Sequence, residues 1–161
     1  MAELLEYPNL TEVLQRFAEY FHTEYADRLI AHDRVASREL LESIRTRVVT
    51  ENGTWSVVVN LRDYWKYVEN DTKPHWPPPD AILRWVEIKP TIPRPYTLNG
   101  REISAKSLAY LVGRKIARVG TKGTHDLELA RLQTFERFKK EIAEALGRDV
   151  VAYIHKLFQN N

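Results

Sequence analysis

The sequence predicts an α+β fold in which helices pack on a small antiparallel β-sheet. Both ends of the chain place apolar residues at steps of three and four, the repeat of an amphipathic helix. Near the middle, two β-rich runs flank Asn52-Gly53, a pair that suits a type I′ hairpin turn. The 161 residues match one domain of ordinary size. We therefore expect a single domain over residues 1–161.

The first helix is predicted from Asn9 to about His32. Asn9 followed by Glu12 fits an N-cap with its capping-box partner. A short second helix is expected over 37–44, with Ser37 as its cap and Leu40, Leu41 and Ile44 turned inward. The apolar positions of the first helix are Leu10, Leu14, Phe17, Phe21, Tyr25 and Leu29.

A β-hairpin is predicted over about 45–61. The residues after the turn alternate, so that one face carries Trp55, Val57, Val59 and Leu61. An apolar hairpin face must be covered to be stable in water, and we expect the first helix to cover it.

Aromatic and proline residues concentrate in the region that follows. Residues 63–69 predict a short helix, and Pro74 with Pro77 to Pro79 imposes extended backbone. A further short helix opens at Pro79-Asp80, with Ile82, Trp85 and Val86 on its buried side. The loop 89–103 holds three prolines and a second Asn-Gly turn, and its length favours an arm or contact loop.

Two more helices complete the prediction. One spans about 104–119 behind Ser104, with its apolar residues on one arc, Arg114 and Arg118 on the other, and Gly120 and Gly123 after its end. The last begins near Leu132, and Gly147 is a candidate kink or break. Its apolar positions are Phe135, Phe138, Ile142, Leu146, Val150, Ile154 and Leu157.

Composition excludes several classes of function. Cysteine is absent, which rules out disulfides and thiolate chemistry and suits a reducing compartment or a particle assembled inside a cell. The first residues are acidic where a signal peptide is basic, and no apolar run approaches the ~20 residues of a membrane span. We expect a protein made in the cytoplasm that has no contact with membranes.

Charge is uneven along the chain. Residues 1–33 carry seven acids against two basic residues, a net of −5, whereas residues 101–122 carry six basic residues against one acid, a net of +5. Opposite poles could attract neighbouring copies, or the basic pole could meet phosphate. Two solvated helix faces explain the pattern equally well.

No catalytic or metal motif stands out. The histidines form no HExxH-type pair, and the dipeptides His32-Asp33 and His125-Asp126 are common by chance. The glycines of residues 120–123 follow a helix, so they favour a helix end over a nucleotide loop. We expect no enzymatic activity, no catalytic or metal-binding residues and no cofactor, although a dispersed acid pair would leave no signature in sequence.

The aromatic and proline-rich segments instead predict contacts with other proteins. Of Tyr64, Trp65 and Tyr67, at least one is expected to pack in the core. Trp76, between His75 and three prolines, is hard to bury, and an aromatic on a stiff loop loses little entropy on binding. The predicted subunit-interface residues are Trp76, Pro77, Pro78, Ile92, Pro95 and Tyr96.

The basic pole offers a second candidate surface. A few cations on one helix could neutralise phosphates without reading bases. A solvated helix face or ion pairs to a neighbouring subunit are the alternatives. The residues are Arg101, Lys106, Arg114, Lys115, Arg118 and Lys122.

The order of elements resembles the tail-completion proteins of tailed bacteriophages, also described as neck, minor-tail or head–tail joining proteins, above all those of phages of Bacteroidetes. The likeness covers roughly residues 34–125. Its first part is a small-residue and leucine stretch ending in Ser-Ile before the hairpin. Its later parts are an aromatic Tyr-x-x-Tyr-Val-Glu element and a helix ending in Ile-x-x-x-Gly-Thr. The matching residues are Ala36, Ser37, Leu40, Leu41, Ser43, Ile44, Tyr64, Tyr67, Val68, Glu69, Ile116, Gly120 and Thr121.

The resemblance implies a non-enzymatic virion protein that joins the DNA-filled head to the tail. Such proteins form sixfold or twelvefold homo-oligomeric rings, so the implied partners are further copies and other neck, portal or tail proteins. Non-specific contact with packaged DNA would also follow. The sequence departs from the family pattern at Arg38, where a glycine is usual, and in its longer proline-rich insert 89–103. The alternatives are a nucleic-acid-binding accessory protein that uses residues 101–122 and an enzyme with a dispersed acid pair.

Overall fold

The computed structural model describes residues 7–34 and 38–159, and the fold is α+β, as predicted. Within these residues it has six helices, one two-stranded antiparallel sheet and a second, very short one. The chain divides into two compact units. Of the described residues, unit 1 comprises 7–27, 44–60 and 127–159, and unit 2 comprises 28–34, 38–43 and 61–126. That residues 1–161 fold as one domain stays a prediction.

Helix α1 spans Pro8–Ala31, within one residue of the prediction. Proline fits a first helical turn because the N–H that it lacks would have no helical partner there. Asn9 therefore lies inside the helix, and its prediction as the N-cap was wrong. The first turn is capped from elsewhere: the backbone N–H groups of Asn9 and Leu10 donate to the buried carboxylate of Asp149, at 3.1 and 2.8 Å.

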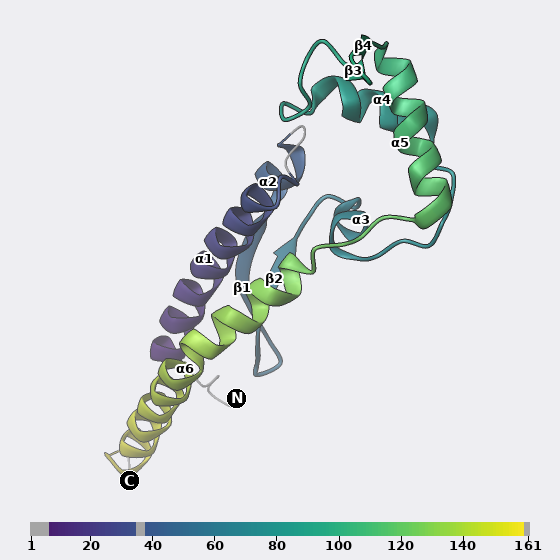
Figure 1. Cartoon of the computed structure of the whole chain (residues 1–161). Coiled ribbons are helices and arrows are strands. Elements are labelled where there is room, and N and C mark those ends of the chain that lie inside the picture. Colours follow the sequence, from purple (N-terminus) through teal and green to yellow (C-terminus); the bar gives the residue numbers. More distant parts are fainter. Residues whose placement is uncertain (1–6, 35–37, 160–161) are drawn as a thin grey trace. The chain divides into compact units, whose positions relative to one another are not determined.

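Helix α6, Asp126–Gln159, runs antiparallel to α1 within unit 1 (Figure 1). Phe138 is the centre of their contact, with the Phe17 and Tyr20 rings each 5.8 Å away. Val13 and Ala145 are buried in the same cluster. The helix begins about six residues before the predicted start, because Leu129 continues its apolar spacing upstream, and it passes through Gly147 without a break.

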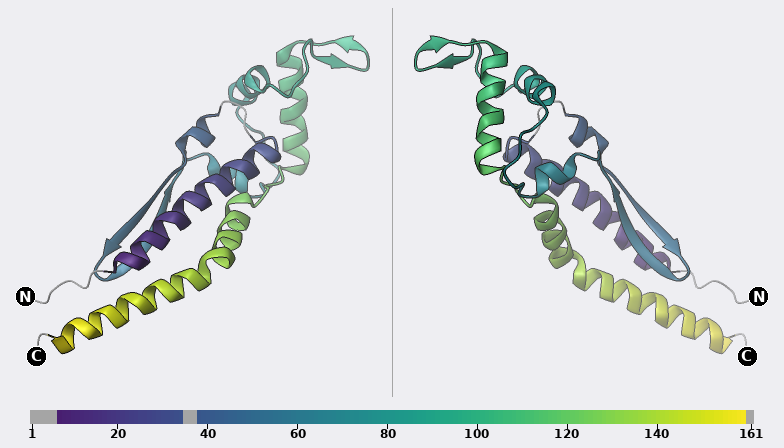
Figure 2. Two further views of the ribbon diagram at one scale, coloured as in Figure 1. Left: turned by 90° about the vertical axis from the view of Figure 1, so that its left-hand side faces the viewer. Right: turned by 90° about the vertical axis from the view of Figure 1, so that its right-hand side faces the viewer.

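The hairpin of unit 1 forms as predicted. Strands β1, Arg45–Glu51, and β2, Thr54–Asn60, pair antiparallel from Arg45↔Asn60 to Glu51↔Thr54. Asn52 and Gly53 both have positive φ, 50° and 75°, as a type I′ turn requires. The hairpin lies alongside α1 (Figure 2), and the Trp55 ring meets the Tyr7 ring edge-on at 4.6 Å. Trp55, Val57 and Val59 are half-buried, so the apolar face is partly covered.

Unit 2 holds the shorter helices. They are α2 (Glu39–Ser43), α3 (Trp65–Glu69), α4 (Pro79–Ile88) and α5 (Ala105–Val119). Pro79 starts α4, as expected, and Ser104 caps α5 by accepting the Ser107 N–H at 3.1 Å. The predicted cap Ser37 lies outside the described residues.

The proline-rich segment 89–103 is more ordered than a plain loop. It contains strands β3 (Thr97–Leu98) and β4 (Arg101–Glu102), joined by Asn99-Gly100 with φ of 49° and 76°. The second Asn-Gly pair therefore makes a second hairpin turn, which the sequence had shown only as a turn.

Two glycines let the end of α5 approach the segment after α3. Thr72 and Thr121 form an antiparallel bridge, with Thr72 N–H donating to the Thr121 carbonyl at 2.9 Å. A Cβ on Gly120 would lie 1.9 Å from the Thr72 carbonyl oxygen, and one on Gly123 would lie 2.0 Å from the Glu69 carbonyl oxygen. These glycines thus serve close backbone packing as well as ending the helix. Across the described ranges, no helix is both long and apolar enough to cross a bilayer.

Candidate functional site

In neither histidine–aspartate dipeptide does the histidine contact its neighbouring aspartate. His32 contacts Asp126, not its neighbour Asp33, with Nδ1 at 2.8 and 3.0 Å from the two carboxylate oxygens. His125 lies 4.0 Å from Asp71. Asp126 is fully buried at the start of α6, so His32 supports a buried carboxylate. Among residues 7–34 and 38–159, no group of three or more histidine, aspartate and glutamate side chains could hold a metal ion.

Asp33 follows the end of α1 in a positive-φ conformation and binds the start of the proline-rich segment. Its carboxylate accepts from Lys89 Nζ and Thr91 Oγ1, both at 2.8 Å, and Lys89 also donates to the Asp33 carbonyl at 2.6 Å. Hydrogen bonds from Lys89 and then Thr91 lower the pKa of Asp33 below its ordinary value. The pair is a structural tie within unit 2.

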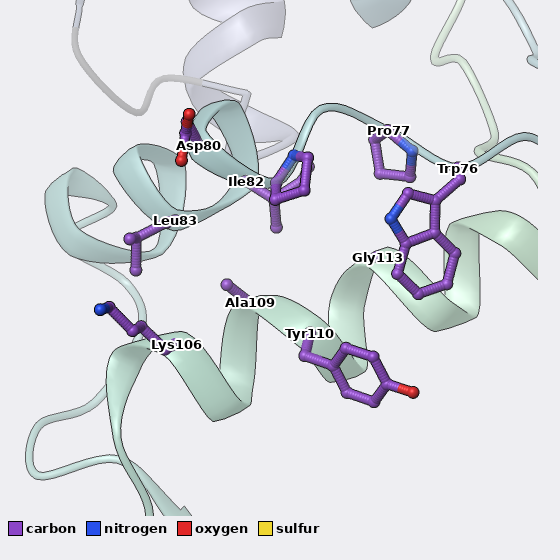
Figure 3. Close-up of a pocket in the computed structure, with 10 residues that line it drawn as sticks. Trp76, Pro77, Asp80, Ile82, Leu83, Lys106, Ala109, Tyr110 and Gly113 are labelled. Atoms are coloured by element: carbon purple, nitrogen blue, oxygen red, sulfur yellow. The ribbon is translucent and has the colours of Figure 1, made fainter.

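The Trp76 loop forms a small apolar pocket with α4 and α5. The pocket has a volume of about 260 Å³, with Trp76 and Tyr110 at one end and Leu83 and Lys106 at the other (Figure 3). The Trp76 and Tyr110 rings pack 5.8 Å apart, yet each side chain remains more than half exposed. Trp76 is therefore available to a partner.

The other predicted interface residues differ in accessibility. Pro77 is buried, so it supports the loop, whereas Pro78 is exposed. In the segment 89–103, Pro95 is exposed, while Ile92 and Tyr96 are half-buried. Tyr96 Oη lies 3.4 Å from the Val86 carbonyl oxygen, which holds the segment against α4.

The predicted basic residues fall into two sets. Lys106, Arg114 and Arg118 share the exposed face of α5, because their positions lie within about 120° of one another at 100° per residue. Lys115 and Lys122 instead line a groove in unit 2. Arg101 lies apart from both, exposed on β4.

That groove was not predicted. It has a volume of about 1080 Å³ and is lined by the end of α1 and by α2, α3, α4 and α5. Tyr64 and Tyr67 line it and are exposed, whereas Trp65 of the same aromatic element is half-buried. The groove collects residues from five separate elements, so no local pattern could reveal it.

The predicted amphipathic helix forms, but the apolar residues of α6 do not all face the core. Of its predicted members, Phe138 is buried and Ile142 is half-buried, while the others are exposed. With further apolar residues, the exposed ones lie within an arc of about 120° at 100° per residue, separate from the Phe138–Ala145 face. Their steps are three or four residues, except for one gap of eleven between Phe135 and Leu146. We call this arc the outer face of α6: Leu129, Leu132, Phe135, Leu146, Val150, Ile154 and Leu157.

The final turns of α6 extend past α1. Because Asp149 bonds to the first turn of α1, the residues 150–159 continue about 15 Å beyond it, at 1.5 Å per residue. All ten are exposed, including Val151, Tyr153 and Phe158.

Comparisons of the chain with protein-family models, with curated proteins and with solved structures found no match.

Proposed function

We propose that this chain is a structural virion protein of the neck of a tailed bacteriophage, one of the copies of a ring that joins the portal complex to the tail. In this role it binds further copies of itself and adjacent neck, portal or tail proteins, and it carries out no turnover. The resemblance of residues 34–125 to tail-completion proteins motivates the identity of the particle.

The outer face of α6 carries the proposal. Side chains as large as leucine and phenylalanine stay about half exposed along this helix. Burying the exposed half of each would contribute roughly 0.7–1.5 kcal/mol, so their exposure favours a protein partner. An apolar repeat of three and four residues suits packing against another helix.

The chemically different surfaces of the two units support a head-to-tail arrangement. Unit 1 presents the outer face of α6, and unit 2 presents Trp76 and the groove. A ring forms when one surface of each copy binds a different surface of the next.

Negative-stain imaging of the purified chain, alone and mixed with proteins encoded beside it, tests this function. We expect rings of six or twelve copies, and portal, capsid and tail genes adjacent to its own. Particles that stay monomeric in every mixture would overturn the proposal.

A matched pair of variants tests whether the outer face of α6 makes the contact. V150Q/I154Q/L157Q removes apolar side chains from that face and should abolish rings while keeping the helical circular dichroism signal. R148Q/A152Q/H155Q changes three exposed positions on the opposite side of the same turns and should leave rings intact.

Binding of nucleic acid is the second candidate, and the shared exposed face of Lys106, Arg114 and Arg118 favours it. None of the three forms an ion pair within the described part of the chain. R114E/R118E should then abolish a salt-sensitive binding of duplex DNA that K115E/K122E, with the same charge change, largely retains. Absence of duplex binding by the unaltered chain at low salt would remove this candidate.

A further inference from the structure

The groove of unit 2 is apolar inside and open to solvent. Its walls carry Leu40, Ile82, Trp85, Val112 and Ile116. Several large side chains that line it are well exposed, with Tyr67 at 69% and Val119 at 66% of their full accessible area. The groove therefore leaves a sizeable apolar surface in contact with water, as a peptide-binding groove does.

Among the charged side chains that line the groove, most are basic. Six cations and two carboxylates line it, a net charge of +4. Lys89 pairs with Asp33 at 2.8 Å, and Arg84 pairs with Glu39 at 3.3 Å, so the two carboxylates are already engaged. The lining cations are Arg34, Arg38, Arg84, Lys89, Lys115 and Lys122.

An occupant that fits must combine apolar side chains with negative charge. The first six residues of this chain, Met-Ala-Glu-Leu-Leu-Glu, lie outside the described structure and have that composition. Leu4 and Leu5 lie between Glu3 and Glu6, and no Lys or Arg side chain interrupts them. Fully extended, six residues span about 20 Å.

We propose that the groove of one copy binds residues 1–6 of a second copy. Leu4 and Leu5 enter the apolar interior, and Glu3 and Glu6 meet the basic rim, where Lys115 and Lys122 form no ion pair with any other described residue. Donor segment and acceptor groove are different surfaces, so each copy gives one contact and receives another. The inference deepens the proposed self-assembly and rests on it.

Peptide binding tests the acceptor groove directly. A fluorescent peptide of residues 1–10, MAELLEYPNL, is titrated against the full-length L4S/L5S chain, whose own donor segment is weakened. We expect binding by fluorescence anisotropy. It should weaken about tenfold or more when K115E/K122E is added, because the rim charges then repel the glutamates.

The controls distinguish binding in the groove from attraction of the peptide to any basic surface. R114E/R118E, on the outer face of α5 away from the groove, should change the peptide affinity less than about twofold. The peptides MAKLLKYPNL and MAESSEYPNL should bind weakly or not at all. Equal binding of the lysine peptide, or an equal loss in both double charge reversals, would overturn the inference.

A mixing experiment tests exchange between copies. Both chains carry V150Q/I154Q/L157Q, which removes the outer face of α6 as a contact. Of the groove contact, the chain with L4S/L5S keeps only the groove, and the chain with K115E/K122E keeps only the donor segment. Analytical ultracentrifugation should show each variant as a monomer when alone and a one-to-one complex when they are mixed. A mixture that stays monomeric would overturn exchange between copies.

The two proposals fail separately. Rings that form from L4S/L5S protein would overturn the groove contact and leave the proposed function standing. Peptide binding by a chain that never assembles with neck components would overturn the proposed function and leave the groove's specificity standing.

Discussion

Asp149 of α6 caps the first turn of α1 by accepting the backbone N–H groups of Asn9 and Leu10. The first N–H groups of a helix have no partner within it, and a carboxylate there also meets the positive end of the helix dipole. Because this contact fixes the register of the two helices, it also decides that residues 150–159 extend past α1.

Removing the cap should destabilise unit 1. D149A leaves the N–H groups of Asn9 and Leu10 without an acceptor in a buried position and should lower the free energy of unfolding by about 1–3 kcal/mol. D149N keeps one acceptor oxygen and should lower the free energy of unfolding by less than D149A does. Urea unfolding monitored by circular dichroism measures both, and a D149A chain as stable as the exposed-site control R148A would contradict the capping role.

Gly123, in the loop after α5, and Gly147, inside α6, should respond oppositely to alanine. G123A puts a Cβ 2.0 Å from the Glu69 carbonyl oxygen, which forces the backbones apart and should destabilise the chain by about 1–3 kcal/mol. G147A meets no atom within 4 Å in the middle of α6 and should stabilise it by about 0.5–1 kcal/mol. Thermal melts of the two variants check the signs.

The His32–Asp126 contact should matter for stability and not for metal binding. H32A leaves the fully buried Asp126 carboxylate without this partner and should cost about 1–3 kcal/mol. H155A, at an exposed position on α6, should change stability by less than about 0.5 kcal/mol. A zinc-dependent rise in melting temperature that H32A abolishes would contradict this interpretation.

The stabilisation from Asp33 should disappear in acid. The pKa of Asp33 is lower in the folded chain than its ordinary value of 3.8. The ionised carboxylate therefore stabilises the fold at pH values above 3.8, and this stabilisation is lost as the pH falls through the pKa of the folded chain. D33N keeps a residue that tolerates positive φ but removes the charge. The unaltered chain and D33N should therefore differ in the midpoint of urea unfolding at pH 6, and this difference should shrink as the pH is lowered to about 2.5. A difference that stays constant over this range would show that the charge is not its cause.

Local features were determined by the sequence because they depend on residues a few positions apart. The periodic stripe of α1, the Asn52-Gly53 turn, Pro79 at the start of α4 and the Ser104 cap of α5 all formed where the pattern indicated. Each needs only its own neighbours along the chain to be satisfied.

The tertiary structure decided which partner each of these elements meets. The first turn of α1 is capped by the carboxylate of Asp149, 140 positions from Asn9, and not by the Asn9 side chain. His32 contacts Asp126 and not the adjacent Asp33. Helix α6 carries large apolar residues on two arcs, and only the arc that includes Phe138 packs against α1. Periodicity shows only that a helix has an apolar surface. Whether that surface is buried depends on a second surface that long-range packing brings to it. No such surface packs on the outer face of α6 within the described residues, so this face stays exposed.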